Sequence, residues 1–280
     1  MSREKIGGEI NSAELDQFVG REDAAEGHRG PAQGVLLGRN RYDNVYCLDK
    51  TRVKLTAEPN ANDYIHANYV DTPLKDHRFI CTQGPTTTSI TDFWRMVWQE
   101  HVQFIIMLSN FEENGREKCA HYFPEKSGAT IQFDQFIICC VYCSRMTDSK
   151  YSILCRELSL KVDGDARAVA IKHFQWAEWP DHGVPETDRS VLRVLDKVRM
   201  SNRPIVVHCS AGIGRSGVVI TIECVLEAMY SQEDCSDMLA LLKQLRQQRA
   251  GLVQTVQVRF CCYDGNETLY LGEDGMWVVN

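Results

Sequence analysis

The sequence predicts a single α/β domain. A β-branched run, Ile205–Val207, leads into a glycine-containing loop, and apolar residues at helical spacing follow over Val218–Met229. Short apolar runs typical of strands and amphipathic stretches typical of helices occupy the rest of the 280 residues. The sequence shows no internal repeat and no long low-complexity linker, which favours one domain over two. Hydrophobic residues make up 44% of the chain and charged residues 25%, which supplies ample material for a core.

The N-terminal part is predicted to be a polar lead-in followed by two strands and a helix. Residues 1–36 form the lead-in, with a short helix over Ser12–Phe18. Asn62–Val70 predicts a polar turn that enters a strand, and Phe79–Pro85 predicts a second strand and turn. Thr91–Gln99 carries its aromatic side chains in one apolar stripe, so we expect an amphipathic helix with a buried face.

The middle of the chain is predicted to be rich in strands. Phe104–Leu108 is expected to be a buried strand that runs into a charged hairpin tip, Glu112–Tyr122. The following runs predict an antiparallel meander, with strands over Phe133–Cys143, Ser152–Leu160 and Ala168–Trp176. The pair Asp163-Gly164 indicates a turn between the last two strands.

Two more helices and a tail complete the predicted domain. Helical periodicity covers Arg189–Met200 and Ser236–Arg249, and Gly251 ends the second helix. Glycine and asparagine residues break the periodicity after Cys261. We therefore place the domain at residues 37–262 and expect residues 263–280 to form an irregular tail of the same domain.

Composition narrows the class of protein. The formal net charge of −7 argues against binding nucleic acid through a general basic surface. No apolar run approaches the roughly 20 residues of a membrane-spanning helix, and Met1–Gly20 lacks the apolar core of a signal peptide. Because nothing indicates export, the 12 cysteines suggest reduced thiols in a cytoplasm. The cysteines between Cys139 and Cys155 lie among apolar strand residues without paired zinc-finger spacing, so we expect no metal.

The loop after Val207 combines a nucleophile with an anion cradle. Gly212 and Gly214 let the backbone curl around an anion at a helix N-terminus, where the helix dipole is positive. Arg215 adds a planar fork suited to two phosphate oxygens, and the same positive field favours the thiolate form of Cys209. This arrangement predicts in-line attack of sulfur on phosphorus. The alternative is a buried structural cysteine beside an ordinary turn.

A second stretch supplies a proton donor. Trp179–Pro185 is a proline-bounded turn that exposes Asp181, and the alternative is that the turn is merely rigid. A poor oxygen leaving group departs slowly at neutral pH unless a proton donor meets its oxygen, and general acid catalysis contributes about 10²–10⁴-fold. Asp181 is expected to donate this proton in a first step and to take one from water in a second.

These two stretches carry a family resemblance. The segment His208–Gly217 resembles the signature loop of the cysteine-dependent protein tyrosine phosphatases, and Trp179–Pro185 resembles the general-acid loop of that family. The resemblance spans Leu37–Phe260. It implies the single-domain tyrosine phosphatase fold, a twisted mixed β-sheet flanked by α-helices. It also implies hydrolysis of phosphotyrosine in proteins through a cysteinyl-phosphate intermediate, without a cofactor or a metal.

The resemblance assigns the catalytic roles. Cys209 attacks the phosphoryl group, Arg215 stabilises its oxygens, and Asp181 protonates the leaving phenol. In the second step Ser216 assists departure of the thiolate and Gln254 orients water. The loop residues that would surround the phosphate are Ser210, Ala211, Gly212, Ile213 and Gly214. Gln257 matches a second glutamine of the family, but the segment between the two glutamines is one residue shorter here.

Other segments are expected to support the site. Arg39–Val45 resembles the phosphotyrosine-recognition loop, in which Tyr42 matches the aromatic ring that packs against the substrate ring. Asn44 stands where many relatives have an aspartate that contacts the peptide backbone. The supporting residues that the resemblance implies are His208, Glu113 as partner of Arg215, Lys118 near the acid loop, Tyr122 as partner of His208, Trp179 and Gln257. His66 replaces the asparagine that is more usual in the family framework.

Two other functions stay open at this point. One is a module that binds phosphotyrosine proteins without turnover, although Cys209, Arg215 and Asp181 together argue against it. The other is a dual-specificity or lipid phosphatase that shares only the cysteine-arginine loop, against which Tyr42 predicts a deep cleft. The expected partners are phosphotyrosine proteins, and we expect a monomer. A weaker resemblance, carried by Tyr64–Val70 and the tail, is to tyrosine phosphatases of parasitoid-wasp viruses; it would place the protein in host-cell cytoplasm, acting on host phosphoproteins.

Overall fold

The computed structural model describes residues 38–56, 62–147, 149, 151–179, 190–234 and 237–254, together with the backbone of 268–270 and 276–278. The predictions for Ser12–Phe18, Asp181 and Gln257 lie outside the described residues. The domain bounds at residues 1–36, 37–262 and 263–280 stay predictions.

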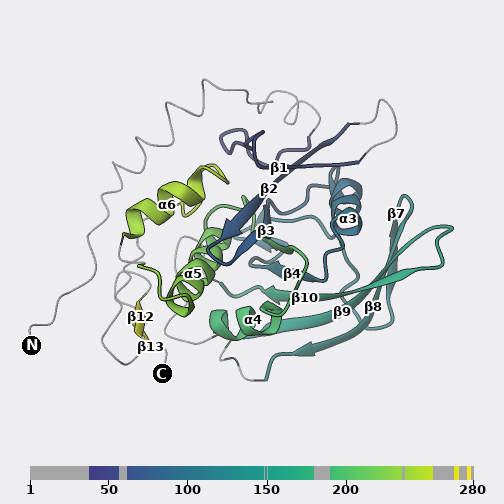
Figure 1. Cartoon of the computed structure of the whole chain (residues 1–280). Helices are drawn as coiled ribbons and strands as arrows, with labels where there is room; N and C mark the ends of the chain where they lie inside the picture. Colours follow the sequence, from purple (N-terminus) through teal and green to yellow (C-terminus); the bar gives the residue numbers. More distant parts are fainter. Residues whose placement is uncertain are drawn as a thin grey trace, which may run out of the picture.

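One large mixed sheet forms the framework of the domain (Figure 1). Its strands follow the order β1-β2-β3-β11-β4-β10-β9-β8-β7. Their bounds are β1 Arg52–Lys54, β2 Tyr64–Thr72, β3 Lys75–Thr82, β4 Phe104–Met107, β7 Thr130–Phe133, β8 Phe136–Arg145, β9 Ile153–Val162, β10 Ala168–Trp176 and β11 Ile205–His208. The central strand β11 pairs in parallel with β3 and β4, and β4 with β10, whereas the outer pairs are antiparallel. The predicted mixed sheet is confirmed.

Helices cover both faces of the sheet. On one face lies α3, Ile90–Gln99, and on the other lie α4, Ser190–Val198, α5, Arg215–Tyr230, and α6, Met238–Arg246. The strand residues alternate between two buried clusters, because successive side chains of a strand point to opposite faces. Val206 packs with α3, whereas Ile205 and Val207 pack with α4 and α5.

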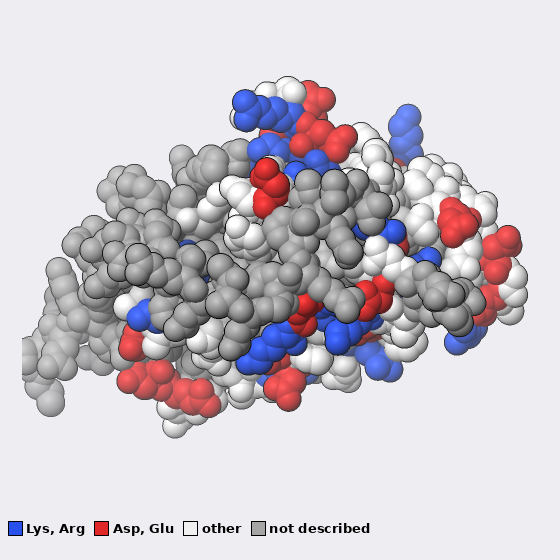
Figure 2. Space-filling model, turned by 90° about the horizontal axis from the view of Figure 1, so that it is seen from above, with Lys and Arg blue, Asp and Glu red and all other residues white. Residues whose placement is uncertain are grey.

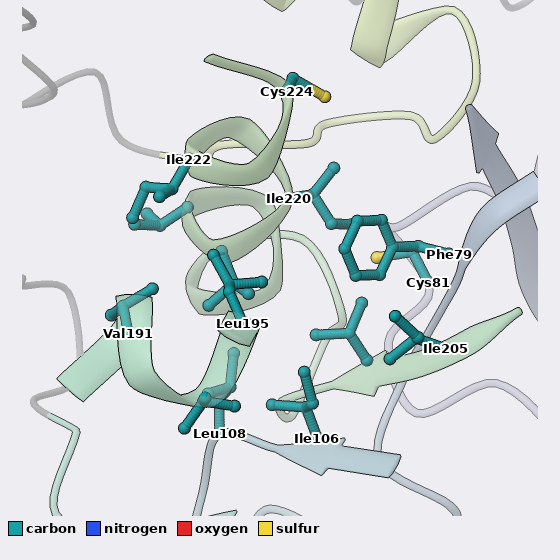
Figure 3. Packing of buried hydrophobic residues seen from close by; sticks show 14 of the residues in the cluster. Phe79, Cys81, Ile106, Leu108, Val191, Leu195, Ile205, Ile220, Ile222 and Cys224 are labelled. Atoms are coloured by element: carbon teal, nitrogen blue, oxygen red, sulfur yellow. The ribbon is translucent and has the colours of Figure 1, made fainter. Parts of the chain in front are cut away.

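Figure 3 shows the cluster between α4, α5 and the sheet, to which α4 contributes Val191 and Leu195 and α5 contributes Ile220 and Ile222. Burying each of these side chains contributes about 1.5–3 kcal/mol. Because α5 begins directly after the loop at Cys209, this packing fixes where that loop leaves the sheet.

Some predicted elements differ in detail. The run Phe133–Cys143 is not one strand, because Asp134 has a φ of 52° and turns the chain between β7 and β8. The helix predicted over Val218–Met229 begins three residues earlier, at Arg215. The charged hairpin tip is confirmed as β5, Glu112–Glu113, paired with β6, Arg116–Glu117. In the tail, the backbone of β12, Thr268–Tyr270, pairs with that of β13, Met276–Val278, which the irregular-tail prediction did not include.

The surface carries both signs of charge. On the face seen in Figure 2, described lysines and arginines lie interspersed with aspartates and glutamates. Among the described helices, none combines the length and the apolar character that crossing a membrane requires.

Candidate active site

The site is built where the central strand ends. β11 carries His208 as its last residue, Cys209 follows, and α5 begins at Arg215. We call residues 209–214 the phosphate loop. Because β11 lies between two strands parallel to it, the phosphate loop emerges at the carboxyl edge of the sheet, where open α/β folds bind ligands.

Cys209 lies at the base of the phosphate loop. Its side chain is buried, and the amide of Gly212 donates to its Sγ at 3.3 Å. This contact places a backbone donor next to the sulfur. Ser216, on the first turn of α5, is fully buried, and its Oγ has no hydrogen-bond partner among the described residues. Its hydroxyl is therefore still available as a donor.

Neighbouring segments hold four consecutive carbonyl groups of the phosphate loop. Gly84 N donates to Ser210 O at 2.9 Å, and Val253 N donates to Ile213 O at 2.8 Å. Arg249 donates from Nη2 to Ala211 O and from Nε to Gly212 O, each at 3.1 Å. In a trans peptide the N–H points away from the C=O. The four following amides, of Ala211, Gly212, Ile213 and Gly214, are therefore turned away from these donors, as in loops that bind anions through backbone amides.

Glycine is required at position 212. Its φ is +68°, and a Cβ there would lie 2.0 Å from Thr82 O, inside the neighbouring strand β3. A side chain at this position would push the phosphate loop away from the sheet.

Arg215 is fixed by a carboxylate. Its Nη1 and Nη2 donate to the two oxygens of Glu113 at 2.6 and 2.7 Å, and Nη1 also donates to Leu108 O at 2.9 Å. Such a bidentate pair sets the plane of the guanidinium. Glu113 accepts further from Asn110 N at 3.1 Å, and Lys118 Nζ lies 3.9 Å from it. The structure thus brings Glu113 and Lys118 to Arg215.

His208 belongs to a buried chain of hydrogen bonds. Tyr122 Oη lies 2.8 Å from His208 Nε2 and 2.7 Å from His173 Nε2. His208 Nδ1 lies 3.2 Å from Cys209 O, a contact that assigns the proton to Nδ1. Tyr122 then donates to His208, and His173 donates to Tyr122. Burial lowers the pKa of His208 to about 4 and that of His173 well below its ordinary value, so both rings are neutral.

The Tyr42 segment reaches the phosphate loop. We call residues 39–45 the recognition loop. Tyr42 Oη lies 2.8 Å from Ser210 Oγ, and Arg41 anchors the segment by donating to Pro85 O at 2.7 Å and Gly84 O at 3.1 Å. Asn44 is exposed. The aromatic ring therefore stands next to the phosphate loop, while the amide remains open to solvent.

The remaining predicted residues are placed unevenly. A Cβ built on Gly214 would lie 3.6 Å from Gln254 Oε1, so Gln254 adjoins the phosphate loop. Trp179 is buried against Trp176, with ring centroids 4.8 Å apart. Asp181 and Gln257 lie outside the described residues. Within the described part of the chain, no group of three or more His, Cys, Asp or Glu side chains is placed to hold a metal ion.

Sequence reasoning did not single out Arg249 or His173, and it treated His66 only as a framework residue. Arg249 is the last residue of the helix predicted over Ser236–Arg249, yet it lies past the end of α6, fully buried behind the carbonyls of the phosphate loop. The one available signal was the unusual histidine at position 66, whose ring contacts Arg249.

Comparison with known proteins agrees with this geometry. The family model described as protein-tyrosine phosphatase matches residues 37–265. The tyrosine-protein phosphatase Lar-like of Caenorhabditis elegans is 39% identical over 233 residues, which cover 81% of this chain and 10% of that protein. The chain thus spans about a tenth of the length of that relative.

Solved structures show the same likeness. The catalytic domain of human protein tyrosine phosphatase non-receptor type 18 has a TM-score of 0.76 and 29% identity, over 87% of this chain and 90% of that one. A second structure of the type 18 enzyme, in complex with HER2 phospho-peptides, has a TM-score of 0.72 and 28% identity, over 87% of this chain and 83% of that one. The chain therefore belongs to the protein-tyrosine phosphatase family.

Proposed function

We propose that this protein hydrolyses phosphotyrosine in proteins through a cysteinyl-phosphate intermediate. The observation that carries the proposal is the phosphate loop itself, in which the amide of Gly212 donates to Cys209 Sγ and the next residue after the loop, Arg215, has its guanidinium fixed by Glu113. These are the groups that in-line attack on phosphorus requires, namely a nucleophile and preorganised donors for the equatorial oxygens.

In the first step, Cys209 Sγ forms a bond to phosphorus while the bond to the tyrosine oxygen breaks. Arg215 and the amides of the phosphate loop stabilise the three equatorial oxygens. Asp181 donates its proton to the departing phenol oxygen, a role that its place in the family's general-acid loop supports. Because Tyr122 and His208 hold the Cys209 carbonyl, the backbone beneath the nucleophile stays fixed.

In the second step, water attacks the phosphorus and the sulfur leaves. Gln254, next to Gly214, orients the water, and Asp181 takes its proton. Ser216 donates its unused hydroxyl proton toward the departing thiolate, which the lack of another partner supports. Lys118, near Glu113, and Gln257 have supporting roles, and Trp179 anchors the start of the acid segment.

The substrate class follows from the recognition loop. Tyr42 next to Ser210 offers a ring against which the phosphotyrosine ring packs. Asn44, which is exposed, contacts the peptide backbone of the substrate. The type 18 relative has been solved with phospho-peptides, which supports phosphotyrosine proteins as partners. The nine described cysteines are free, which supports a cytoplasmic location. A monomer, and a viral source with host phosphoproteins as substrates, remain predictions.

Hydrolysis of para-nitrophenyl phosphate by wild type and Cys209→Ser tests the proposal. We expect turnover by wild type and none above background for the variant. Equal rates for the two proteins would refute it. Phosphoserine peptides and phosphoinositides should react far more slowly than a phosphotyrosine peptide, and an Asp181→Ala protein should retain phosphotyrosine proteins in a pull-down.

A further inference from the structure

His66 lies between two functional loops. It is a buried residue of β2, and its Nε2 lies 3.0 Å from Val45 O, the last carbonyl of the recognition loop. Its Nδ1 lies 3.0 Å from Arg249 Nη1, and Arg249 holds two carbonyls of the phosphate loop. One imidazole thus contacts the recognition loop directly and the phosphate loop through a single side chain.

The two contacts determine the tautomer of His66. A guanidinium can only donate, so Nδ1 must carry a lone pair, and a carbonyl can only accept, so Nε2 must carry the proton. A second proton on Nδ1 would face the guanidinium. Burial, with the charge of Arg249, lowers the pKa of His66 to about 3. The ring therefore keeps the same neutral form throughout the pH range of a phosphatase assay.

The contact of His66 with Arg249 matters for the amides of the phosphate loop. Arg249 draws back Ala211 O and Gly212 O, which turns the amides of Gly212 and Ile213 to the opposite side of their peptide planes. The first of these amides meets Cys209 Sγ at 3.3 Å. Removing the His66 ring would leave Nη1 with Asn68 Oδ1 at 2.9 Å, so the guanidinium would be held by one hydrogen bond fewer and its position would be less strictly fixed.

We propose that His66 is a positioning residue that couples the recognition loop to the phosphate loop through Arg249. The proposal rests on the proposed function, since it concerns the same site. The coupling complements the surface contact between Tyr42 and Ser210, so that the two loops are joined at both their polar rim and their buried base. A substitution at position 66 should therefore change binding at the phosphate loop, which His66 itself does not touch.

The test compares His66→Leu, His66→Asn and a control, Thr72→Val. Leucine fills space without hydrogen bonds, whereas asparagine keeps one donor and one acceptor. Thr72 lies on the same strand, far along it from His66, and among the described residues its hydroxyl donates only to Lys75 O at 3.4 Å. Orthovanadate affinity, measured by calorimetry, needs no turnover and reports on the phosphate loop.

We expect His66→Leu to weaken orthovanadate binding by about tenfold, because a buried donor loses its partner. His66→Asn should recover most of this loss, and Thr72→Val should bind orthovanadate like wild type. Alkylation of Cys209 by iodoacetate at pH 6 should slow in His66→Leu alone. Orthovanadate affinity within twofold of wild type for His66→Leu, or a loss that merely follows the melting temperature across all three variants, would overturn the proposal.

A measurement on wild type keeps the proposal testable if His66→Leu does not fold. The ¹⁵N–¹H imidazole spectrum should show His66 as the Nε2–H tautomer from pH 5 to 8. An imidazolium or an Nδ1–H tautomer would overturn the proposal. A wild type that binds orthovanadate but hydrolyses no phosphotyrosine would refute the proposed function and leave this positioning role intact.

Discussion

Two buried arginines contact the candidate site, and their charges are balanced differently. Arg215 shares its charge with both oxygens of Glu113. Arg249 is fully buried, yet among the described residues its hydrogen-bond partners are only neutral acceptors: two loop carbonyls, His66 and Asn68. A carboxylate fixes the first arginine, whereas hydrogen bonds alone stabilise the second.

The difference indicates a division of labour. Glu113 balances the charge of Arg215 in the absence of a bound anion. The same ion pair holds the plane of the guanidinium group fixed, which prepares it to bind two oxygens of a phosphoryl group. Arg249 has no carboxylate among its described hydrogen-bond partners, so a bound anion would add a counter-charge beside it. We therefore propose that Arg215 contacts substrate, while Arg249 positions the loop and favours its occupied state.

The largest effect is expected from removing Arg215. Arg215→Met should lower kcat by about 10³–10⁵-fold, as losing an arginine that stabilises a phosphoryl transition state does. Steady-state hydrolysis of a phosphotyrosine peptide measures this. Glu113→Gln serves as the matched control, since it keeps the fork but weakens its anchor and should cost less. A kcat within tenfold of wild type for Arg215→Met would contradict its role.

A smaller loss is expected at Arg249. Arg249→Met should lower kcat/KM by about 10²-fold, because two charge-assisted hydrogen bonds to the phosphate loop are lost. Arg249→Lys keeps the positive charge but loses the planar guanidinium group. The activity of this variant therefore separates the effect of the charge from the effect of the hydrogen bonds to the loop. Arg78→Lys is the control, because Arg78 is equally buried but pairs with Glu223 at 3.1 Å. Equal activity losses for Arg78→Lys and Arg249→Lys would contradict a specific role of Arg249 at the phosphate loop.

Acid should destabilise the fold through its buried histidines. The pKa of His66 is lowered to about 3 and that of His208 to about 4, from 6.5, by burial. Below pH 6.5 the unfolded chain binds protons that the folded rings do not, so the stability present above pH 6.5 is lost as pH falls. Each such histidine contributes a slope of about 1.4 kcal/mol per pH unit.

Urea unfolding at pH 6.5, 5.75 and 5 measures this slope. His173→Asn removes one of these groups, since the pKa of His173 also lies well below its ordinary value. The variant should therefore show a shallower pH dependence by about one proton. An unchanged slope would mean that His173 is protonated in the folded state.

The smallest effect is expected at the polar rim. Tyr42→Phe keeps the ring and removes only the hydroxyl that lies 2.8 Å from Ser210 Oγ. One neutral hydrogen bond contributes about 0.5–1.5 kcal/mol, so KM should rise roughly two- to tenfold with kcat nearly unchanged. Tyr42→Ala should raise KM further, because the ring is lost as well. Equal KM values for the two variants would show that the aromatic ring of Tyr42 does not contribute to substrate binding.

Local pattern was sufficient for most of the framework. The β-branched run Ile205–Val207 and the glycines after it predicted a strand, a loop and a helix, and these are present. The prediction merged β7 and β8 into one strand for a reason that is also local. Asp134 adopts a positive φ there, which aspartate tolerates but does not adopt often enough to be predicted from sequence.

Long-range contacts were beyond such reasoning. Arg249 and His66 are 183 residues apart, and nothing in either local pattern indicates that one accepts a hydrogen bond from the other. The pairing of Glu113 with Arg215 was expected only through family resemblance, since its charged hairpin would otherwise suggest a solvated tip. In a sequence, a polar residue that is buried for function cannot be told from a polar residue on the surface, because neither belongs to the periodic pattern of apolar residues.

The backbone bonds that hold the phosphate loop carry a consequence for engineering. The amides of Gly84 and Val253 donate hydrogen bonds to Ser210 O and Ile213 O, respectively. Arg249 donates to the two carbonyl oxygens between them, those of Ala211 and Gly212. A peptide with the sequence of Cys209–Gly214 would have none of these partners and would lose the orientation of its amides. If the motif is grafted onto another strand-to-helix junction, the segments that carry Gly84, Val253 and Arg249 must therefore be transferred with it. The loop sequence alone would not suffice.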